Sequence, residues 1–562
     1  MKEGFRQSMA WLHTWSGLLV GWVLFMVFAA GTAAYFREEI TLWMKPELHR
    51  VAHGAVSADE ALAKAQEFLQ SKAAGSSRWT IELPSSREPL LRVNWAVQAP
   101  ARPASAEGQA QGQNQRQRRA RNESALLDAS TGQPAAAVRE TRGGDFLYRL
   151  HFDLHYMPVV WGRWIVGVCA MFMLVAILSG IVTHKRIFAD FFTFRPKKGQ
   201  RSWLDAHNAT AVLALPYHLM ITYTGLVTLM FMYMPWGPEA VYKEDRRTYI
   251  AEVFPSGAGF GNERAAGSQA PLVALAPLLQ AAGAAWHGAP ASRVIVQNPG
   301  DAAARVTLYR AESGSLSSHQ VSMTFDGASG KPLGGAGENI APASETRGVL
   351  YGLHLGRFAH PLVRWLFFVA GLVGCLMVAT GLLLWGVKER QNYAKVLAQG
   401  GRMGFGVRLV DGLNIGAVAG VPIAIAAYFW ANRLVPSGAA ERPATEIAWF
   451  FGLWAASAVA GLAWPRRRMW QLQLMLGGLM FACLPVLNPL TGGAGLPTSI
   501  AQSLWPVAGF DLTVLAIGAG LFAAGAWLGW RKKAKTGAAQ PASRPGPLPN
   551  APGGLDAARA VQ

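Results

Sequence analysis

The chain contains eight long runs of mostly apolar residues, and each run is about as long as a helix that crosses a membrane. A hydrocarbon core about 30 Å thick requires roughly 20 apolar residues in a helix. The runs cover approximately residues 14–36, 159–183, 208–234, 361–386, 409–431, 446–464, 471–490 and 510–530. The first is followed by Arg37-Glu38-Glu39 where a signal peptide would have a small-residue cleavage site, so we expect it to remain as a span. The pattern predicts an all-α polytopic membrane protein with about eight transmembrane helices.

Basic residues in the short loops set the expected orientation. Lys and Arg concentrate between the second and third runs and after the fourth run, and short loops of this kind stay in the cytoplasm. Arg466-Arg467-Arg468 and Arg531-Lys532-Lys533 fall on the same side if there are eight spans. We therefore expect a multi-pass protein of the bacterial inner membrane with both termini in the cytoplasm.

Two long segments, 38–150 and 235–350, then lie on the far, periplasmic side, and their patterns are similar. The first has a capping box at Ser57 to Glu60, an amphipathic helix and alternating strands; the second repeats the order of helix and strands. We expect each to form a small α+β domain, and the aperiodic stretch 99–122 to be a disordered insertion. The expected organisation is span 1 at 1–37, a periplasmic domain at 38–150, span 2 at 151–184, a basic loop at 185–203, span 3 at 204–234, a second periplasmic domain at 235–350, span 4 at 351–387, a loop at 388–408, four additional spans at 409–530 and a disordered cytoplasmic tail at 531–562.

Composition excludes several function classes. The formal charge is +19, but only 15% of residues are charged, 51% are hydrophobic and there are 21 Trp, so basic cytoplasmic loops explain the charge better than a nucleic-acid partner does. All three cysteines lie inside apolar runs, which argues against disulfides, a Cys-based zinc site and an iron–sulfur cluster. The chain has no Gly-x-Gly-x-x-Gly after a strand and no cytoplasmic segment large enough for flavin and nicotinamide.

Histidines and glycines repeat through the first four spans. His13 is followed 18 residues later by Gly31, and His207 is followed 18 residues later by Gly225. Leu-Tyr-x-Leu-His occurs twice, at 147–151 and 350–354, ahead of spans 2 and 4, and Gly180 and Gly381 lie near the far ends of those spans. The chain is therefore built on a duplicated unit of helix, polar domain and helix.

Histidine in hydrocarbon is costly unless it is paired or binds a ligand. His218 lies 11 residues after His207, which on one continuous helix would place both imidazoles within about 20° of the same face and roughly 16 Å apart. Neutral imidazole suits iron, copper or zinc, but no carboxylate or thiolate accompanies these histidines at zinc-site spacing. Two histidines from different helices among Gly, Ala, Leu and Phe fit the axial ligation of a b-type haem. Interfacial histidines without a ligand are the simpler alternative.

The same segments resemble a known family, the PepSY-associated transmembrane proteins, and within it the ferric-siderophore reductase branch. The resemblance covers about residues 1–400 and rests on Trp11-Leu12-His13, on 188–196, on Asp205-Ala206-His207, on 215–225 and on the two Leu-Tyr-x-Leu-His sequences. It implies two PepSY-like periplasmic domains and two haems b in an internally duplicated four-helix core. It assigns haem ligation to His13, His207, His218, His354, His151 and His155. His184 is left as a reserve ligand or propionate partner, and His360 is expected to cap a helix or to face the membrane interface.

Two site predictions follow. His13 and His207 occupy equivalent repeat positions at a common depth, so we expect them to share an inner haem. His354 is expected to hold an outer haem with one of His218, His151 or His155.

The expected function is that of an inner-membrane di-haem b reductase, a haem-dependent oxidoreductase that passes electrons to a periplasmic Fe(III)-siderophore and releases Fe(II). The donor would be quinol or a soluble cytoplasmic protein docking on 184–201, and Trp79, Trp95, Trp236 and Trp286 would either meet the chelate or form domain cores. The alternative is a non-enzymatic membrane protein that binds or regulates a periplasmic partner.

Overall fold

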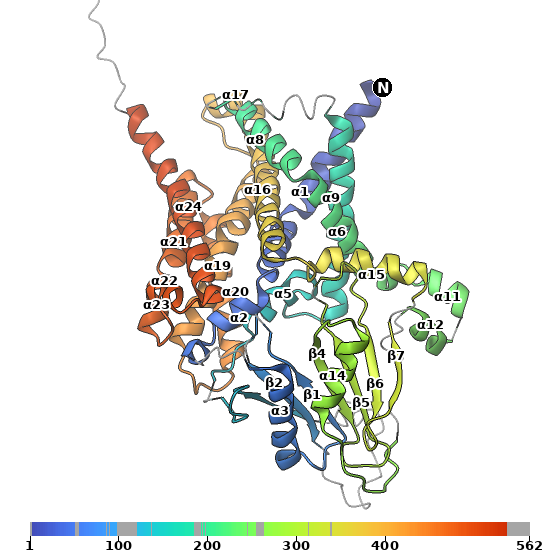
Figure 1. The fold of residues 1–562 in the computed structure, drawn as a ribbon. Coiled ribbons are helices and arrows are strands. Elements are labelled where there is room, and N and C mark those ends of the chain that lie inside the picture. The colour runs from blue at the N-terminus through green and yellow to red at the C-terminus, as the bar shows by residue number, and fades with distance from the viewer. Residues whose placement is uncertain are drawn as a thin grey trace, which may run out of the picture.

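The computed structural model describes residues 3–50, 56–85, 87–88, 90–97, 121–135, 138–184, 191, 193, 195–196, 198–243, 245–253, 264–312, 314–337 and 340–536. Most of the insertion expected at 99–122 and most of the expected tail lie outside these residues, although β3 begins at Arg121 and α24 continues to Thr536. A helical bundle carries a single sheet at one end, and the N-terminus, the short helix α17 (Ala394–Ala398) and the start of α8 lie at the other (Figure 1).

The bundle contains seven described helices that are long and apolar enough to cross a membrane, or eight if one bent pair is a single span. The core consists of α1 (Glu3–Ala34), α6 (Val159–Thr183), the pair α8 (Gln200–Leu213) and α9 (Leu215–Thr228), and α16 (Pro361–Asn392). The additional unit consists of α18 (Phe405–Asn414), η3 (Ile415–Ala419), α19 (Gly420–Leu434), α20 (Arg442–Ala463), α21 (Arg467–Ala482), α22 (Leu484–Leu490), α23 (Leu496–Ala501) and α24 (Trp505–Thr536). These helices match the eight predicted runs.

The third span is broken, contrary to the continuous helix assumed from sequence. α8 and α9 meet at Ala214 with an angle of 67°. Pro216 lies in the first turn of α9; it has no backbone N–H, and within a continuous helix its ring would clash with the carbonyl of Val212. His207 and His218 consequently lie on different helices, and the helical face they were predicted to share does not exist.

Short helices connect the spans to the sheet. They are α2 (Arg37–Trp43), η1 (Pro46–Arg50), α5 (Gly143–Asp153), α10 (Met230–Tyr233), α11 (Trp236–Tyr242), α12 (Arg246–Val253) and α15 (Pro342–Leu355). α5 and α15 precede α6 and α16 respectively and carry the two Leu-Tyr-x-Leu-His sequences. The duplicated histidines thus lie on separate short helices at the sheet end of the bundle.

The two polar segments contribute to one sheet instead of forming separate domains. The first supplies β1 (Arg78–Glu82), β2 (Leu91–Val97) and β3 (Arg121–Leu127); the second supplies β4 (Ala291–Gln297), β5 (Arg305–Arg310), β6 (Ser322–Asp326) and β7 (Pro332–Ala336). The order is β3-β2-β1-β4-β5-β6-β7, with antiparallel pairing throughout and β1 paired with β4. This pairing covers an edge strand of each half, which would otherwise expose unpaired backbone groups.

Helices α3 (Ala58–Lys72) and α14 (Leu275–Ala285) pack together against the sheet. The predicted capping box is present, with Ser57 and Glu60 bonding each other's backbone N–H. Trp79, Trp95 and Trp286 are buried in this core, whereas Trp236 is 68% exposed. Of the four tryptophans considered as contacts for a chelate, three therefore serve as domain core.

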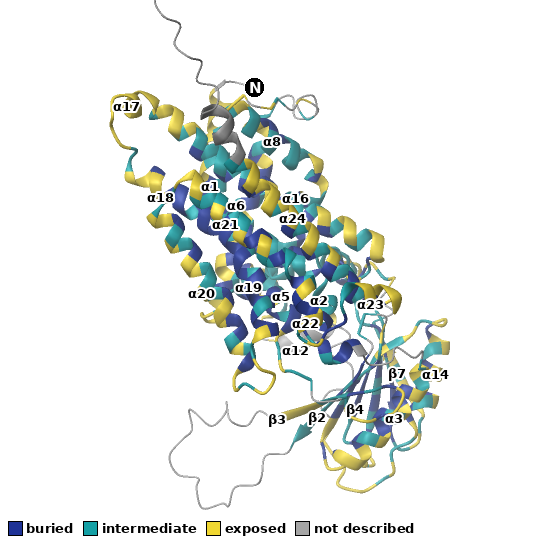
Figure 2. Ribbon diagram, turned by 90° about the vertical axis from the view of Figure 1, so that its left-hand side faces the viewer, coloured by how far each residue is buried: buried dark blue, intermediate teal, exposed yellow. Residues whose placement is uncertain are grey.

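The additional unit joins the core through buried polar contacts. Trp43 Nε1 donates to Asp511 Oδ1 at 2.8 Å, and Trp22 Nε1 donates to Asn414 Oδ1 at 2.8 Å. The Arg433 guanidinium lies over the Trp43 ring, 4.0 Å from its centroid. Buried residues run continuously from the core helices into this unit (Figure 2), so the two parts share one hydrophobic core.

Candidate functional site

Four of the predicted histidines form two facing pairs. The rings of His13 (α1) and His207 (α8) have centroids 6.1 Å apart. At the sheet end, the rings of His151 (α5) and His354 (α15) have centroids 6.0 Å apart and planes inclined by 30°. Each pair joins equivalent positions of the two repeats, so each site is completed only when the two halves pack together.

The ring separations match what two imidazoles require when they bind one metal from opposite sides. An imidazole nitrogen binds a metal at about 2.0 Å and the ring centre lies about 1.1 Å behind that nitrogen, which gives roughly 6.2 Å between ring centres. The observed 6.1 and 6.0 Å are close to this value. They also lie within the range of about 4.5–7 Å that is usual for contacts between aromatic rings, and the His151 and His354 rings are stacked.

A backbone carbonyl fixes the tautomer of each of these histidines. Nδ1 lies within hydrogen-bond distance of a carbonyl oxygen in every case: His13 to Ala176 at 2.8 Å, His151 to Val27 at 2.7 Å, His207 to Met377 at 3.0 Å and His354 to Ile221 at 3.2 Å. Because a carbonyl only accepts, Nδ1 carries the proton and Nε2 keeps its lone pair. Metal-binding histidines are commonly oriented in this way.

A glycine provides the space for each imidazole. The accepting carbonyls belong to residues four positions before Gly180, Gly31, Gly381 and Gly225. A Cβ built on these glycines would lie 3.1 Å from His13 Cε1, 2.6 Å from His151 Cε1, 3.1 Å from His207 Cε1 and 3.0 Å from His354 Cε1. The repeated glycines were visible in the sequence, but their contact with the histidine of a neighbouring helix was not.

A cavity of about 470 Å³ opens at the outer pair. His151 and His354 line it together with Gly31, Gly225, Tyr35 and Tyr217, while apolar side chains from α1, α6 and α9 complete the wall. Its volume lies within the range of about 300–1,000 Å³ that is usual for cofactor sites. The outer pair thus faces a space large enough for a bound group.

The other two predicted ligands are placed differently. His218 is buried, 1% exposed, beside the Phe28 ring at 6.2 Å, and its Nε2 has no hydrogen-bond partner among the described residues. His155 stacks on Phe451, with ring centroids 5.5 Å apart; burial and then the Arg142 charge lower its pKa. Among the three candidates for the partner of His354, the structure brings only His151 opposite it.

Two further histidines lie at the ends of spanning helices. His360 is the N-cap residue of α16, but its side chain makes no capping bond, and His184 follows the last residue of α6. Within the described ranges, no group of three or more His, Cys, Asp or Glu side chains could hold a metal ion. Among the described residues, the candidate histidines thus occur as two pairs and not within a larger cluster of possible metal ligands.

Comparison with known proteins matches the part of the chain that contains the two histidine pairs. A protein of Pseudomonas aeruginosa, PA4219, whose function is uncharacterized, is 27% identical over 416 residues, which cover 68% of this chain and 94% of the relative. The profile of the family described as the PepSY-associated TM region matches residues 10–388, which include both histidine pairs and the whole sheet but not the additional unit. The chain belongs to the PepSY-associated TM region family.

Proposed function

We propose that the protein is a di-haem b oxidoreductase of the bacterial inner membrane that reduces a ferric siderophore on the sheet side and releases Fe(II). The most direct support comes from the two histidine pairs, in each of which the ring centres are about 6 Å apart. In all four histidines Nδ1 is bonded to a carbonyl, so Nε2 is the nitrogen that could bind a metal.

The proposal requires one haem site at each histidine pair. His13 and His207 would bind the inner iron, and His151 and His354 the outer iron. The outer cavity supplies an apolar wall, and the four glycines allow the imidazoles to approach the helices closely. Each haem, when bound, accepts and gives up one electron, which matches the one-electron reduction of Fe(III) to Fe(II).

The chain's own contribution is to hold the ligands at two depths. Along α1, His13 and the Val27 carbonyl that holds His151 are 14 residues apart, or about 21 Å of helix axis. Two sites at this separation divide a hydrocarbon core about 30 Å thick into shorter intervals. The carbonyl bonds hold the imidazoles correctly turned in an environment where reorientation would be costly.

The proposed donor and acceptor meet opposite ends of the bundle. The start of α8 lies at the end of the bundle remote from the sheet (Figure 1). Lys198 and Arg201 lie at this start, and their charge could attract an acidic soluble donor; quinol in the lipid bilayer is the other source of electrons. The siderophore would bind at the sheet end, beside His151 and His354.

The first test is haem content. Full-length protein purified from haem-replete cells should contain two b-type haems per chain by the pyridine haemochrome assay, with low-spin bis-histidine electron paramagnetic resonance signals. His13→Ala and His207→Ala should each remove the same haem, and His151→Ala and His354→Ala the other. Colourless wild-type protein would overturn the proposal.

The second test is activity. Protein in vesicles is reduced with dithionite, excess reductant is removed, and ferric siderophores are added one at a time to the sheet side. Haem reoxidation accompanied by Fe(II) in a chromogenic trap is expected for the physiological substrate. Reoxidation no faster than in anaerobic buffer with every siderophore tried would contradict the reductase function.

A further inference from the structure

A second, larger cavity lies on the other side of α5 from the histidine pair. Its volume is about 980 Å³, and its walls come from α5, from 134–135 and 138–142, from β3 and from the start of α20 in the additional unit. Arg149 lines both this cavity and the one that contains His151 and His354. A single helix therefore separates the two spaces.

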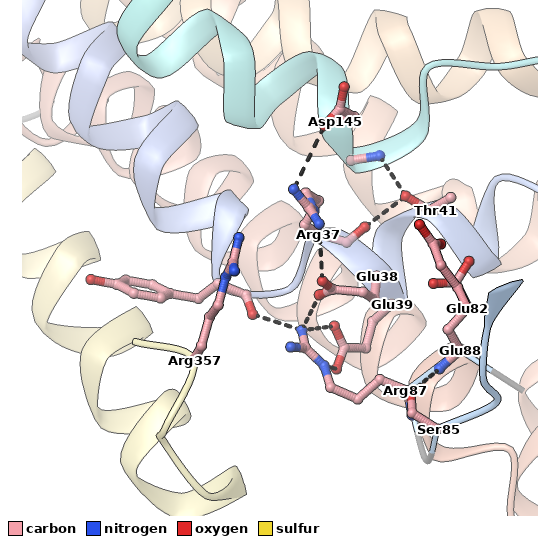
Figure 3. Close-up of polar contacts among 12 residues, drawn as sticks. Arg37, Glu38, Glu39, Thr41, Glu82, Ser85, Arg87, Glu88, Asp145 and Arg357 are labelled. Atoms are coloured by element: carbon pink, nitrogen blue, oxygen red, sulfur yellow. Dashed lines mark hydrogen bonds and ion pairs between the residues drawn. The ribbon is translucent and has the colours of Figure 1, made fainter. Parts of the chain in front are cut away.

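A third cavity of about 340 Å³ adjoins it, and Lys45 and Arg142 line both. Most of the charged side chains around the smaller cavity are already paired. Arg87 bonds Glu39 through Nε at 2.8 Å and through Nη2 at 2.7 Å, and Arg37 Nη1 lies 3.7 Å from Asp145 (Figure 3). These charged side chains pair with one another, so no ligand is needed to balance their charge.

Lys45 and Arg142 differ from these paired residues. Neither makes a salt bridge with any described residue, whereas Arg139 pairs with Glu47 at 2.7 Å and Arg149 with Asp145 at 3.0 Å. Burial, followed by the neighbouring Arg92 charge, lowers the pKa of Lys45, while the more weakly acting Glu88 and Glu47 charges raise it. A bound anion would reduce the cost of keeping this ammonium charged in a confined position. Arg142, Glu140 and Glu441 are exposed and Lys45 is half-buried, so Lys45 is the most deeply placed of these four charges.

Backbone strain gathers around the same cavity. Leu154, Tyr156 and Glu441 have φ of +56°, +56° and +51°, and all three line it. Such conformations cost about 1–3 kcal/mol each and persist where the surrounding structure enforces them, often at ligand sites. Two of these residues lie immediately after α5 and the third precedes α20, on opposite walls.

The additional unit fixes the segment that carries Arg142. Arg139 Nη1 donates to Asn432 O at 2.8 Å, Arg442 Nη1 donates to Glu140 O at 2.7 Å, and Thr141 Oγ1 donates to Glu446 Oε2 at 2.5 Å. Tyr428 OH donates to Gly143 O at 2.9 Å. These contacts give the last four spans, which lie beyond the family match, a role in shaping the cavity.

We propose that this cavity, between α5, α20 and the segment 138–142, binds an anionic ferric chelate whose negative groups face Lys45 and Arg142. This inference rests on the proposed function and specifies its substrate site. The volume suits a bulky chelate, Phe146, His155 and Tyr156 supply aromatic surface, and α5 places the site one helix away from His151. The additional unit supplies the outer wall.

The test measures binding without electron transfer. Full-length protein is dialysed to equilibrium with radioactive gallium(III) citrate, an anionic and redox-inert counterpart of a ferric chelate. Wild type should bind it saturably, and Lys45→Gln/Arg142→Gln should weaken binding about tenfold or more, because each lost contact is a charge-assisted one. The control Lys72→Gln/Lys331→Gln removes two exposed charges elsewhere on the sheet side and should stay within about twofold of wild type.

A second variant changes a residue on the opposite wall of the cavity. Ala444→Trp on α20 should obstruct the space and abolish binding while haem absorption and gel-filtration behaviour stay normal. No saturable binding by wild type, or equal binding by wild type and Lys45→Gln/Arg142→Gln, would overturn the site. Haem content and reoxidation are measured separately, so a failed reductase and a wrongly placed substrate site give different results.

Discussion

Gly31→Ala tests the histidine arrangement without touching a ligand. A Cβ at this position would lie 2.6 Å from both Cε1 and Nδ1 of His151, closer than the corresponding distances at Gly180, Gly225 and Gly381. The imidazole must move away from α1 and lengthen its 2.7 Å bond to the Val27 carbonyl. Overpacking of this kind typically costs about 1–3 kcal/mol, which corresponds to a haem affinity lower by roughly 5- to 150-fold.

The assay is haem content and affinity of purified protein. Gly31→Ala should lose the outer haem on dialysis against apomyoglobin while the inner haem remains. Gly17→Ala on the same helix is the control, because nothing lies within 4 Å of a Cβ built there. The glycine contact would have no part in haem binding if Gly31→Ala kept two haems that dissociate as slowly as those of Gly17→Ala.

Three further predictions concern other elements. His49 donates from Nε2 to Leu42 O and accepts at Nδ1 from Ala494 N–H, and burial lowers its pKa to about 4. Because the unfolded state takes up the proton first as the pH falls, the free energy of unfolding should be highest above about pH 6.5 and should fall by about 3 kcal/mol between there and about pH 4. Thermal unfolding at pH 7 and pH 5 checks this, and His49→Gln should show a smaller difference. Ser57→Ala should destabilise α3 by about 1 kcal/mol through loss of its cap, seen as faster hydrogen exchange in the first turn of α3 and not in α14. Pro216→Ala should straighten the α8–α9 junction, displace His207 and lower the inner haem content, whereas unchanged content would mean that the proline does not set the bend.

The periodic features of the chain were predictable because they depend on local composition. The apolar runs coincide with the helices, and the duplicated histidines and glycines mark the four positions that the structure brings into pairs. Pro216 could have indicated the helix break at Ala214. The apolar run continues across both residues, however, so the length of the run alone predicted one helix. The pairing of β1 with β4 depends on contacts between segments about 200 residues apart, which periodicity cannot reveal. The same applies to the choice of His151 over His218 and His155 as the partner of His354.

The way the pairs are assembled bears on why the chain is duplicated. Within each repeat, a histidine from one helix is held by a carbonyl of the same repeat: His13 by α6 and His151 by α1, then His207 by α16 and His354 by α9. Each pair, however, joins one histidine from each repeat. A single repeat could therefore orient its imidazoles but could not bring together the two imidazoles of a pair. The shared sheet, formed by β1 and β4 from different halves, joins the repeats at the end where His151 and His354 meet, so the pairing of strands and the pairing of ligands support the same association of the two halves.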